Sequence, residues 1–354
     1  MNYYKTKLYK AEIKKNIEHN NMLQVLSGKV CVVTGARGMI GSELIDTIMF
    51  ANQYYGLNCK VYGIVRNMSV ASERFHSFIN DDFFELIQAD INTDFIRVNE
   101  NVDYIIHGAS NTHPVYYATR PIETILTNTV GTSRVLEFAS EHKCQKFIFL
   151  SSVEVYGENR GDVDKFTEDY LGYLDCNTLR AGYPEGKRVG EALCQAYIEE
   201  KNLDCIIPRI SRCYGPGLLN EDSKALSQFI HKAVDREDIV LKSKGNQLYS
   251  YIYAADVVSA ILFLISSGQR GEAYNLSGIE SDITLAELAD CVAAIAGTKV
   301  IYDIPDEKEA AGYSKATKAL LDTSKIESLG WHSRYSVKEG IRRTLEMQGY
   351  YLGE

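Results

Sequence analysis

A tyrosine and a lysine four residues apart are the residues whose spacing first suggests chemistry. Tyr183 and Lys187 lie in the run Tyr-Pro-Glu-Gly-Lys, at the start of a predicted helix over Pro184–Lys201. Residues four apart share one face of a helix, so the phenol and the ammonium can belong to one site. A neighbouring cation favours the phenolate and is expected to lower the pKa of Tyr183 toward neutrality. Such a phenol can exchange a proton with a hydroxyl during hydride transfer, while Lys187 can also hold a nicotinamide ribose.

Two serines stand where a short apolar run ends. Ser151 and Ser152 follow the predicted strand Phe147–Leu150. Open α/β sheets bind their ligands at the carboxyl edge of the strands, where the Ser152 hydroxyl could hydrogen-bond a reacting oxygen. Turn formation or helix capping is the alternative for both serines. Glu154 is an acid at the same strand end and is a candidate contact to substrate.

A glycine-rich loop predicts a dinucleotide site. The run from Thr34 to Gly41 reads Thr-Gly-Ala-Arg-Gly-Met-Ile-Gly, between a predicted strand and a predicted helix. In that context glycines let backbone amides approach a pyrophosphate at a helix N-terminus. An ordinary strand-to-helix turn is the alternative. The residues predicted to bind the cofactor here are Gly35, Arg37, Gly38, Met39, Ile40 and Gly41.

The end of the second predicted strand indicates which dinucleotide is bound. An NAD site usually has an acid there that accepts from the adenosine ribose, but this strand ends in Val65-Arg66-Asn67. Arg66 and Arg37 could both reach a ribose 2′-phosphate, which suits forked guanidinium donors. Each arginine by itself is equally typical of a solvated surface. Together they favour NADP(H) over NAD(H).

The elements that must position these residues follow an α/β pattern. Short apolar runs alternate with longer segments of helical period, which is typical of strand–helix units on a parallel sheet. The predicted strands are Val30–Thr34, Lys60–Val65, Phe84–Ile87, Tyr104–His107, Phe147–Leu150 and Cys205–Ile210. The predicted helices are Ser42–Tyr54, Pro121–His142, Pro184–Lys201, Asp256–Ser266 and Leu285–Ala296. The fold predicted is a Rossmann-type, doubly wound parallel sheet with a smaller mixed α/β lobe.

The chain length supports two regions and a leading segment. With 354 residues, and about 150 per domain, one large or two moderate domains are expected. We expect residues 1–26 to form a polar, partly helical extension outside the main fold. We expect residues 27–210 to form the dinucleotide-binding domain and residues 211–354 to form a substrate-binding lobe, with some of the chain crossing back.

Composition excludes several partners. Acidic residues outnumber basic ones by 47 to 38, for a net charge of −9, and such a surface repels a nucleic-acid backbone. The first twenty residues lack the apolar core of a secretory signal, and no apolar stretch approaches the roughly twenty residues of a membrane span. The eight cysteines show no spacing typical of a metal site. We therefore expect a cytoplasmic protein without metal, nucleic-acid or membrane partners.

Four motifs in order resemble those of a known family. The glycine loop, Ser-Ser-Val-Glu-Val-Tyr-Gly, Tyr-Pro-Glu-Gly-Lys and Pro-Arg-Ile-Ser-Arg-Cys-Tyr-Gly-Pro-Gly resemble the extended short-chain dehydrogenase/reductases, the NAD(P)-dependent nucleotide-sugar epimerases and dehydratases, over about Ser27 to Leu345. The resemblance implies Ser152, Tyr183 and Lys187 as the catalytic triad and Asn128 as a helix asparagine at the cofactor. It also implies a nucleotide-diphosphate sugar as substrate and a homodimer. Further predicted cofactor contacts are Asp90, Ile91, Ala109 and Ser110.

Departures from the family pattern narrow the chemistry. Val153 stands where hexose 4,6-dehydratases of the family carry an acid, which disfavours dehydration. Arg212 replaces the usual phosphate-binding asparagine, and Tyr249 replaces the usual arginine. We predict that both contact the substrate and that the phosphate contact has changed strands. A structural ion pair is the alternative for Arg212.

The sequence favours net reduction of a keto-sugar, because a pocket of the NADPH type suits reduction and cells keep NADPH reduced. A loose resemblance of the whole chain to enzymes of CDP-linked sugar pathways for surface polysaccharides suggests a CDP-linked substrate. One alternative is an epimerase or dehydratase that recycles its cofactor internally. Another is a non-catalytic dinucleotide sensor, although such a protein would normally have lost Tyr183 or Lys187.

Overall fold

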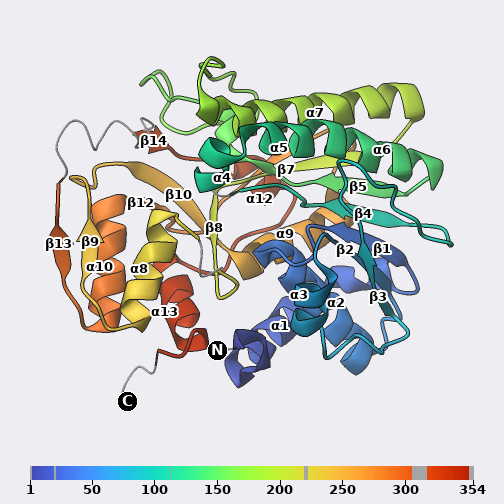
Figure 1. The fold of residues 1–354 in the computed structure, drawn as a ribbon, viewed down its shortest axis with the longest axis horizontal. Coiled ribbons are helices and arrows are strands. Elements are labelled where there is room, and N and C mark those ends of the chain that lie inside the picture. Colours follow the sequence, from blue (N-terminus) through green and yellow to red (C-terminus); the bar gives the residue numbers. More distant parts are fainter. Residues whose placement is uncertain (1, 20, 113, 219–221, 305–316, 351–354) are drawn as a thin grey trace.

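A parallel sheet forms the centre of the molecule (Figure 1). The computed structural model describes residues 2–19, 21–112, 114–218, 222–304 and 317–350. Among these residues the central strands are β1 Val30–Thr34, β2 Lys60–Val65, β3 Phe84–Gln88, β4 Tyr104–His107, β5 Lys146–Phe149, β6 Ser151–Ser152, β7 Cys205–Ile210 and β11 Ala273–Leu276. Their order is β11-β7-β5-β4-β1-β2-β3, with β6 beside β7, and the pairs are parallel.

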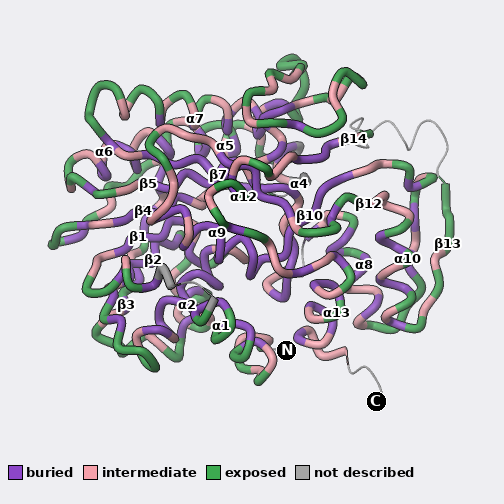
Figure 2. Tube along the Cα trace, turned by 180° about the vertical axis from the view of Figure 1, so that it is seen from behind, coloured by how far each residue is buried: buried purple, intermediate pink, exposed green. Residues whose placement is uncertain are grey.

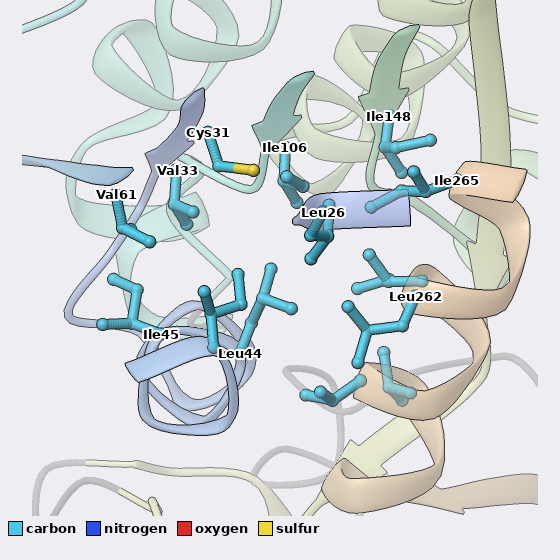
Figure 3. Close-up of a cluster of buried hydrophobic side chains, with 14 of the residues drawn as sticks. Leu26, Cys31, Val33, Leu44, Ile45, Val61, Ile106, Ile148, Leu262 and Ile265 are labelled. Carbon is cyan, nitrogen blue, oxygen red and sulfur yellow. The ribbon is translucent and has the colours of Figure 1, made fainter. Parts of the chain in front are cut away.

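Helices cover both faces of this sheet, which explains the nearly continuous apolar strands. Helices α2 (Met39–Tyr55) and α9 (Ala254–Ser267) pack on one face, where Cys31 and Val33 point (Figure 3). Helices α6 (Thr132–Glu141) and α7 (Gly182–Lys201) pack on the other, which takes the alternate residue Val32. The predicted Rossmann-type fold is confirmed, and the predicted strand bounds agree with the observed ones to within one residue.

A smaller mixed lobe lies beyond the carboxyl edge of the sheet. Its strands are β8 Arg212–Tyr214, β9 Ile239–Leu241, β10 Leu248–Tyr253, β12 Asp282–Thr284, β13 Val300–Tyr302 and β14 Lys318–Ala319. Strand β10 is central, since β12, β14 and β8 all pair with it, and β13 pairs with β9. Among the described residues the helices of this lobe are α8 Ala225–Val234, α10 Leu285–Ala296 and α13 Val337–Met347, whereas α12 Ser324–Ser328 packs beside β11 of the large sheet. Side chains of α8, α10 and α13 form a second hydrophobic core with β9 and β10.

The chain returns from this lobe to the large sheet. After β10, helix α9 runs across the sheet beside α2, and β11 then pairs with β7. Helix α9 has buried residues on nearly every side, from Ala254 to Ile265. That explains its long apolar run without a membrane span. None of the helices in the described ranges is long and apolar enough to cross a bilayer.

The helix predicted over Pro121–His142 is divided. It consists of α5 (Pro121–Leu126), a π-helical segment (Thr127–Gly131) and α6. The extra residue in a π turn rotates the side chains that follow it, and such segments often mark functional sites. The remaining short helices are α3 Met68–Arg74 and α4 Pro114–Thr119.

The N-terminal segment is part of the core, so the expectation of an extension outside the main fold is wrong. Helix α1 (Lys7–His19) buries Tyr9, Ile13 and Ile17 against α2 and α9. Figure 2 shows the trace of α1 beside α2, with both buried and exposed positions. These three residues are spaced four apart and therefore form one stripe along the helix. The many lysines of the segment masked this stripe at the level of composition.

Candidate active site

A cleft opens at the carboxyl ends of β1 and β4, where the order of the strands in the sheet reverses. Strand β1 has β2 on one side and β4 on the other, so the connections that leave β1 and β4 diverge at their carboxyl ends. Ligands of open α/β sheets bind at such a point. The cleft has a volume of about 360 Å³. Predicted cofactor residues that line it are Gly35, Arg37, Gly38, Met39, Arg66, Asp90, Ile91, Ala109 and Ser110.

Sequence reasoning missed part of this lining. The loops after β2 and β4 add Asn67, Asn111 and Thr112, and the second lobe adds Gly217, Leu218, Asp222 and Lys224. Nothing in the local pattern distinguishes these residues, since the fold brings them to the cleft from far apart in the chain. The predicted residues Ile40, Gly41, Asn128, Tyr183 and Lys187 do not line the cleft itself.

The glycine loop forms a cradle that only glycines allow. Gly35 has φ +68°, and a Cβ there would lie 2.7 Å from the Gly108 carbonyl group. A Cβ on Gly41 would lie 2.5 Å from the Gly35 oxygen. Gly38 precedes α2 without a side-chain cap, and its amide donates to Gly35. The first turn of a long helix and an open cradle fit the pyrophosphate of a dinucleotide.

The two predicted arginines lie at the same cleft but differ in their surroundings. Arg37 is exposed. Arg66 forms an ion pair with Glu123, with its Nη1 atom 2.6 Å from Oε1, and its Nη2 atom donates to Asn111 at 3.4 Å. Although partial burial opposes the effect, the hydrogen bonds from Arg66 and Asn111 lower the pKa of Glu123 below its usual range. Glu123 therefore holds Arg66 in place and offsets part of its charge.

Lys187 is buried, with 3% of its surface exposed. Its Nζ donates to the Leu150 carbonyl at 2.7 Å and lies 4.9 Å from the centre of the Phe149 ring. Burial lowers the pKa of Lys187 to about 8, and the nearby Glu191 carboxylate opposes this effect. Lys187 of α7 therefore places a desolvated ammonium at the carboxyl end of strand β5.

Tyr183 lies on the same face of α7 and is also buried. Its ring stacks on Tyr117, with centroids 5.0 Å apart. Burial raises the pKa of Tyr183 above its usual value, and a hydrogen bond with Ser152 offsets this only in part. The expectation that Lys187 brings this pKa toward neutrality is therefore wrong for this structure, because desolvation dominates. Tyr117 was also missed by sequence reasoning.

Ser152 combines the two roles considered for it. As the residue before the short helix Val153–Tyr156, its side chain accepts a hydrogen bond from the Glu154 amide at 3.3 Å. It also lies close enough to Tyr183 to lower the pKa of that phenol in part. The Glu154 carboxylate lies 3.9 Å from Arg180 and is close enough to Tyr183 to act on its pKa. Capping thus places the Ser152 hydroxyl beside the phenol.

Asn128 lies in the π-helical segment and joins the cleft to α7. It accepts a hydrogen bond from Ser110 at 2.9 Å and donates to the Thr124 carbonyl at 2.8 Å. A Cβ on Gly186 would lie 2.8 Å from the Asn128 side chain. Because Gly186 stands between Tyr183 and Lys187, this close approach holds their part of α7 next to Asn128, whose partner Ser110 lines the cleft.

A buried polar network joins the ends of β6 and β7 to α7. Glu191 accepts from Ser151 at 2.5 Å and forms an ion pair with Arg209 at 2.7 Å. Arg209 also donates to Tyr156 at 2.9 Å, and Tyr156 donates to Asn275 at 2.6 Å. Glu191 stands one helical turn after Lys187, a spacing that could have revealed it in the sequence.

The two departures from the family pattern meet in space. Strands β8 and β10 pair so that Arg212 lies opposite Tyr251, and the Arg212 guanidinium carbon is 3.4 Å from the centre of the Tyr249 ring. The Nη1 atom of Arg212 is buried without a hydrogen-bond partner among the described residues. Within the same ranges no ion pair involves Arg212, so the structural ion pair considered as its alternative has no support.

The part of the chain that the structure describes contains no group of three or more His, Cys, Asp or Glu residues that could hold a metal ion. The eight cysteines are free thiols, and five of them are buried.

Comparisons with known proteins found relatives in sequence and in fold. UDP-glucuronic acid decarboxylase 6 of Arabidopsis thaliana is 30% identical over 314 residues, which cover 88% of this chain and 86% of the relative. An epimerase from Methanothermobacter thermautotrophicus has a similar structure, with a TM-score of 0.78 at 20% identity over 92% of this chain and 94% of that one. For a UDP-glucuronic acid 4-epimerase from Bacillus cereus, in complex with UDP-glucuronic acid and NAD, the TM-score is 0.75 at 20% identity, over 90% and 98% of the two chains.

The two structural likenesses concern the fold, whereas a family assignment comes from the sequence. Residues 31–277 match the NAD dependent epimerase/dehydratase family, from the first strand of the large sheet to just past β11. The matched region contains the glycine loop, the Ser152 strand end and the Tyr183–Lys187 pair. The chain therefore belongs to the NAD-dependent epimerase/dehydratase family.

Proposed function

We propose that the protein modifies a nucleotide-diphosphate sugar by oxidising one sugar hydroxyl and later reducing the resulting ketone, so that its nicotinamide cofactor is recycled. The observation that carries this proposal is the buried Tyr183–Lys187 pair beside Ser152, adjoining a cleft that fits a dinucleotide. The relatives named above are a decarboxylase and epimerases. They support recycling rather than the net reduction favoured by the sequence.

The residues of the chain divide the proton chemistry among them. A bound nicotinamide ring supplies the hydride acceptor for the sugar carbon. As a phenolate, Tyr183 takes the proton of the sugar hydroxyl while the hydride leaves the sugar carbon, and Ser152 donates a hydrogen bond to the same oxygen. The phenol formed in this step returns the proton to that oxygen when the ketone is reduced. Because burial raises the pKa of Tyr183, the phenolate must be stabilised before the transfer, and the ammonium of Lys187, which is charged below about pH 8, provides that stabilisation.

The residue after Ser152 bears on which reaction the sugar undergoes. Val153 offers no acid to protonate a leaving hydroxyl, which argues against dehydration. Epimerisation and decarboxylation need no such acid. Glu154, which is near Tyr183, is proposed to contact the sugar.

The test is incubation with a panel of UDP-, dTDP-, GDP- and CDP-linked sugars and uronic acids, with NAD or NADP in small amounts. We expect a product of unchanged mass or one that has lost carbon dioxide, with no net change in the absorbance of the reduced cofactor. Stoichiometric consumption of NADPH would show a net reductase. Bound cofactor without any product would show a dinucleotide sensor.

Tyr183→Phe tests the proton transfer. The variant keeps the ring that stacks on Tyr117 but lacks the phenol, so cofactor binding should be preserved. Turnover should fall by about two to four orders of magnitude, the usual contribution of a positioned acid–base group. Steady-state kinetics and a cofactor titration measure the two effects. Near-normal turnover would show that another group exchanges the proton.

We propose NADP(H) as the preferred cofactor, supported by Arg37 and Arg66 at the ribose end of the cleft. We expect NADP(H) to bind at least about tenfold more tightly than NAD(H), equivalent to about 1.4 kcal/mol. The double change of both arginines to alanine should abolish the difference. Glu123→Gln should increase it, because the ion pair that offsets the charge of Arg66 is lost. Equal affinity of the wild-type protein for the two cofactors would refute the preference.

We also propose that Arg212 binds the substrate pyrophosphate. Its place on β8 over the Tyr249 ring, and its buried Nη1 atom without a partner, support this role. Arg212→Ala removes a charge-assisted contact worth about 1.5–3 kcal/mol, so substrate affinity should fall about tenfold to a hundredfold. Cofactor affinity should hardly change. A lower melting temperature with unchanged substrate affinity would instead show a structural role.

An exposed apolar surface bears on how the chain assembles. Ile122, Ile125 and Leu126 on α5, Val130 in the π-helical segment and Val189 on α7 are exposed apolar residues on neighbouring elements. An apolar surface of this kind suits a second copy of the chain. We propose a cytoplasmic homodimer, and light scattering of the purified protein gives its mass. A monomer at micromolar concentration would argue against it.

A further inference from the structure

The N-terminal segment reaches the wall of the proposed cofactor cleft. Tyr3 stands in a short 3-10 helix (Tyr3–Lys5) that precedes α1. A Cβ on Gly217 would lie 3.0 Å from the Tyr3 hydroxyl and 3.1 Å from Met39. Gly217 and Met39 both line the cleft.

A cluster of polar contacts fixes this segment to the cofactor side of the molecule. Tyr9 donates to Asp46 on α2 at 2.6 Å, and Arg74 on α3 forms an ion pair with the same carboxylate at 2.5 Å. The Arg74 guanidinium stacks 4.3 Å from the Tyr4 ring and 5.6 Å from the Tyr3 ring. The rings of Tyr3 and Tyr9 meet edge to face at 5.2 Å.

The same segment is fixed to the second lobe. Glu12 of α1 is buried, accepts a hydrogen bond from Tyr253 at 3.0 Å and lies 3.5 Å from Arg343 of α13. Arg334 donates to Asn16 of α1 and lies 3.4 Å from Asp256, in the first turn of α9. Residues 3–19 therefore contact both lobes, as the position of α1 between α2 and α13 in Figure 1 also shows.

We propose that Tyr3 is a positioning residue for the cofactor, which sets the distance between the first turn of α2 and the loop at Gly217. The inference rests on the proposed function in that it takes this cleft as the cofactor site. Gly217 follows β8, the strand that carries Arg212, whereas Met39 begins the helix of the glycine loop. Tyr3 packs beneath the meeting point of these two segments. Its loss lets the loop settle toward α2, and the pyrophosphate loses its fitted site.

The matched pair for a test is Tyr3→Ala and Tyr4→Ala. Both remove a tyrosine ring from the same short helix and from the stack with Arg74, but it is the Tyr3 hydroxyl that lies among the atoms nearest to Gly217. We expect Tyr3→Ala to weaken binding of the reduced dinucleotide about threefold to tenfold, because the ring and hydroxyl that pack against the loop at Gly217 are lost. Tyr4→Ala should stay within about twofold of wild type. Tyr3→Phe should recover part of the loss, because the ring still fills the space.

Two readouts keep this inference separate from the proposed function. The first is cofactor affinity, measured by fluorescence titration of the full chain. The second is amide hydrogen exchange at residues 215–218 and 35–41 without any ligand, which we expect to rise in Tyr3→Ala and not in Tyr4→Ala. Equal affinities or equal exchange in the two variants would overturn the role of Tyr3. Failure of the wild-type protein to bind any nicotinamide dinucleotide, with the exchange difference present, would overturn the proposed function and leave Tyr3 as the residue that positions this loop.

Discussion

The ammonium of Lys187, buried against the carbonyl of Leu150, is the constraint on which the site depends. A buried cation is costly unless its donors are satisfied. Here one carbonyl, the face of the Phe149 ring and the more distant Glu191 carboxylate compensate it. All of these belong to β5 or α7 or follow directly from them. The lysine therefore fixes how the helix lies on the carboxyl end of the sheet, and with it where Tyr183 meets Ser152.

Small residues make this arrangement sterically possible. Gly186 lies against Asn128, and a Cβ on Gly190 would lie 2.3 Å from the Phe149 ring. Glycine inside a helix costs about 0.5–1 kcal/mol relative to alanine, so two such positions in α7 indicate that close packing outweighs helix propensity. Behind the helix, the ion pair between Glu191 and Arg209 holds β6 and β7 in register with it.

Local patterns predicted the sheet and the glycine loop, because a buried strand and a strand–glycine–helix junction are encoded in neighbouring residues. Features that depend on distant contacts were missed. Glu123 pairs with Arg66 across more than fifty residues, and Tyr117 stacks on Tyr183 across a similar separation. The pKa of Tyr183 was predicted in the wrong direction, since spacing shows a neighbouring cation but not the burial of the phenol. The prediction of an extension failed for helix α1 because its many lysines outweigh, in the composition of the segment, the apolar stripe that the helix buries.

The buried Tyr183–Lys187 pair stands beside a cleft that fits a dinucleotide, and the second lobe presents Arg212 and Tyr249 from the adjacent strands β8 and β10. This arrangement depends on a desolvated ammonium of Lys187 at the end of β5. The most direct measurement is an NMR titration of the protein with isotope-labelled lysine, in which Lys187→Met identifies the signal of interest. We expect a titration midpoint at about pH 8. A midpoint at the usual value of 10.5 would contradict it, because the ammonium would then be solvated.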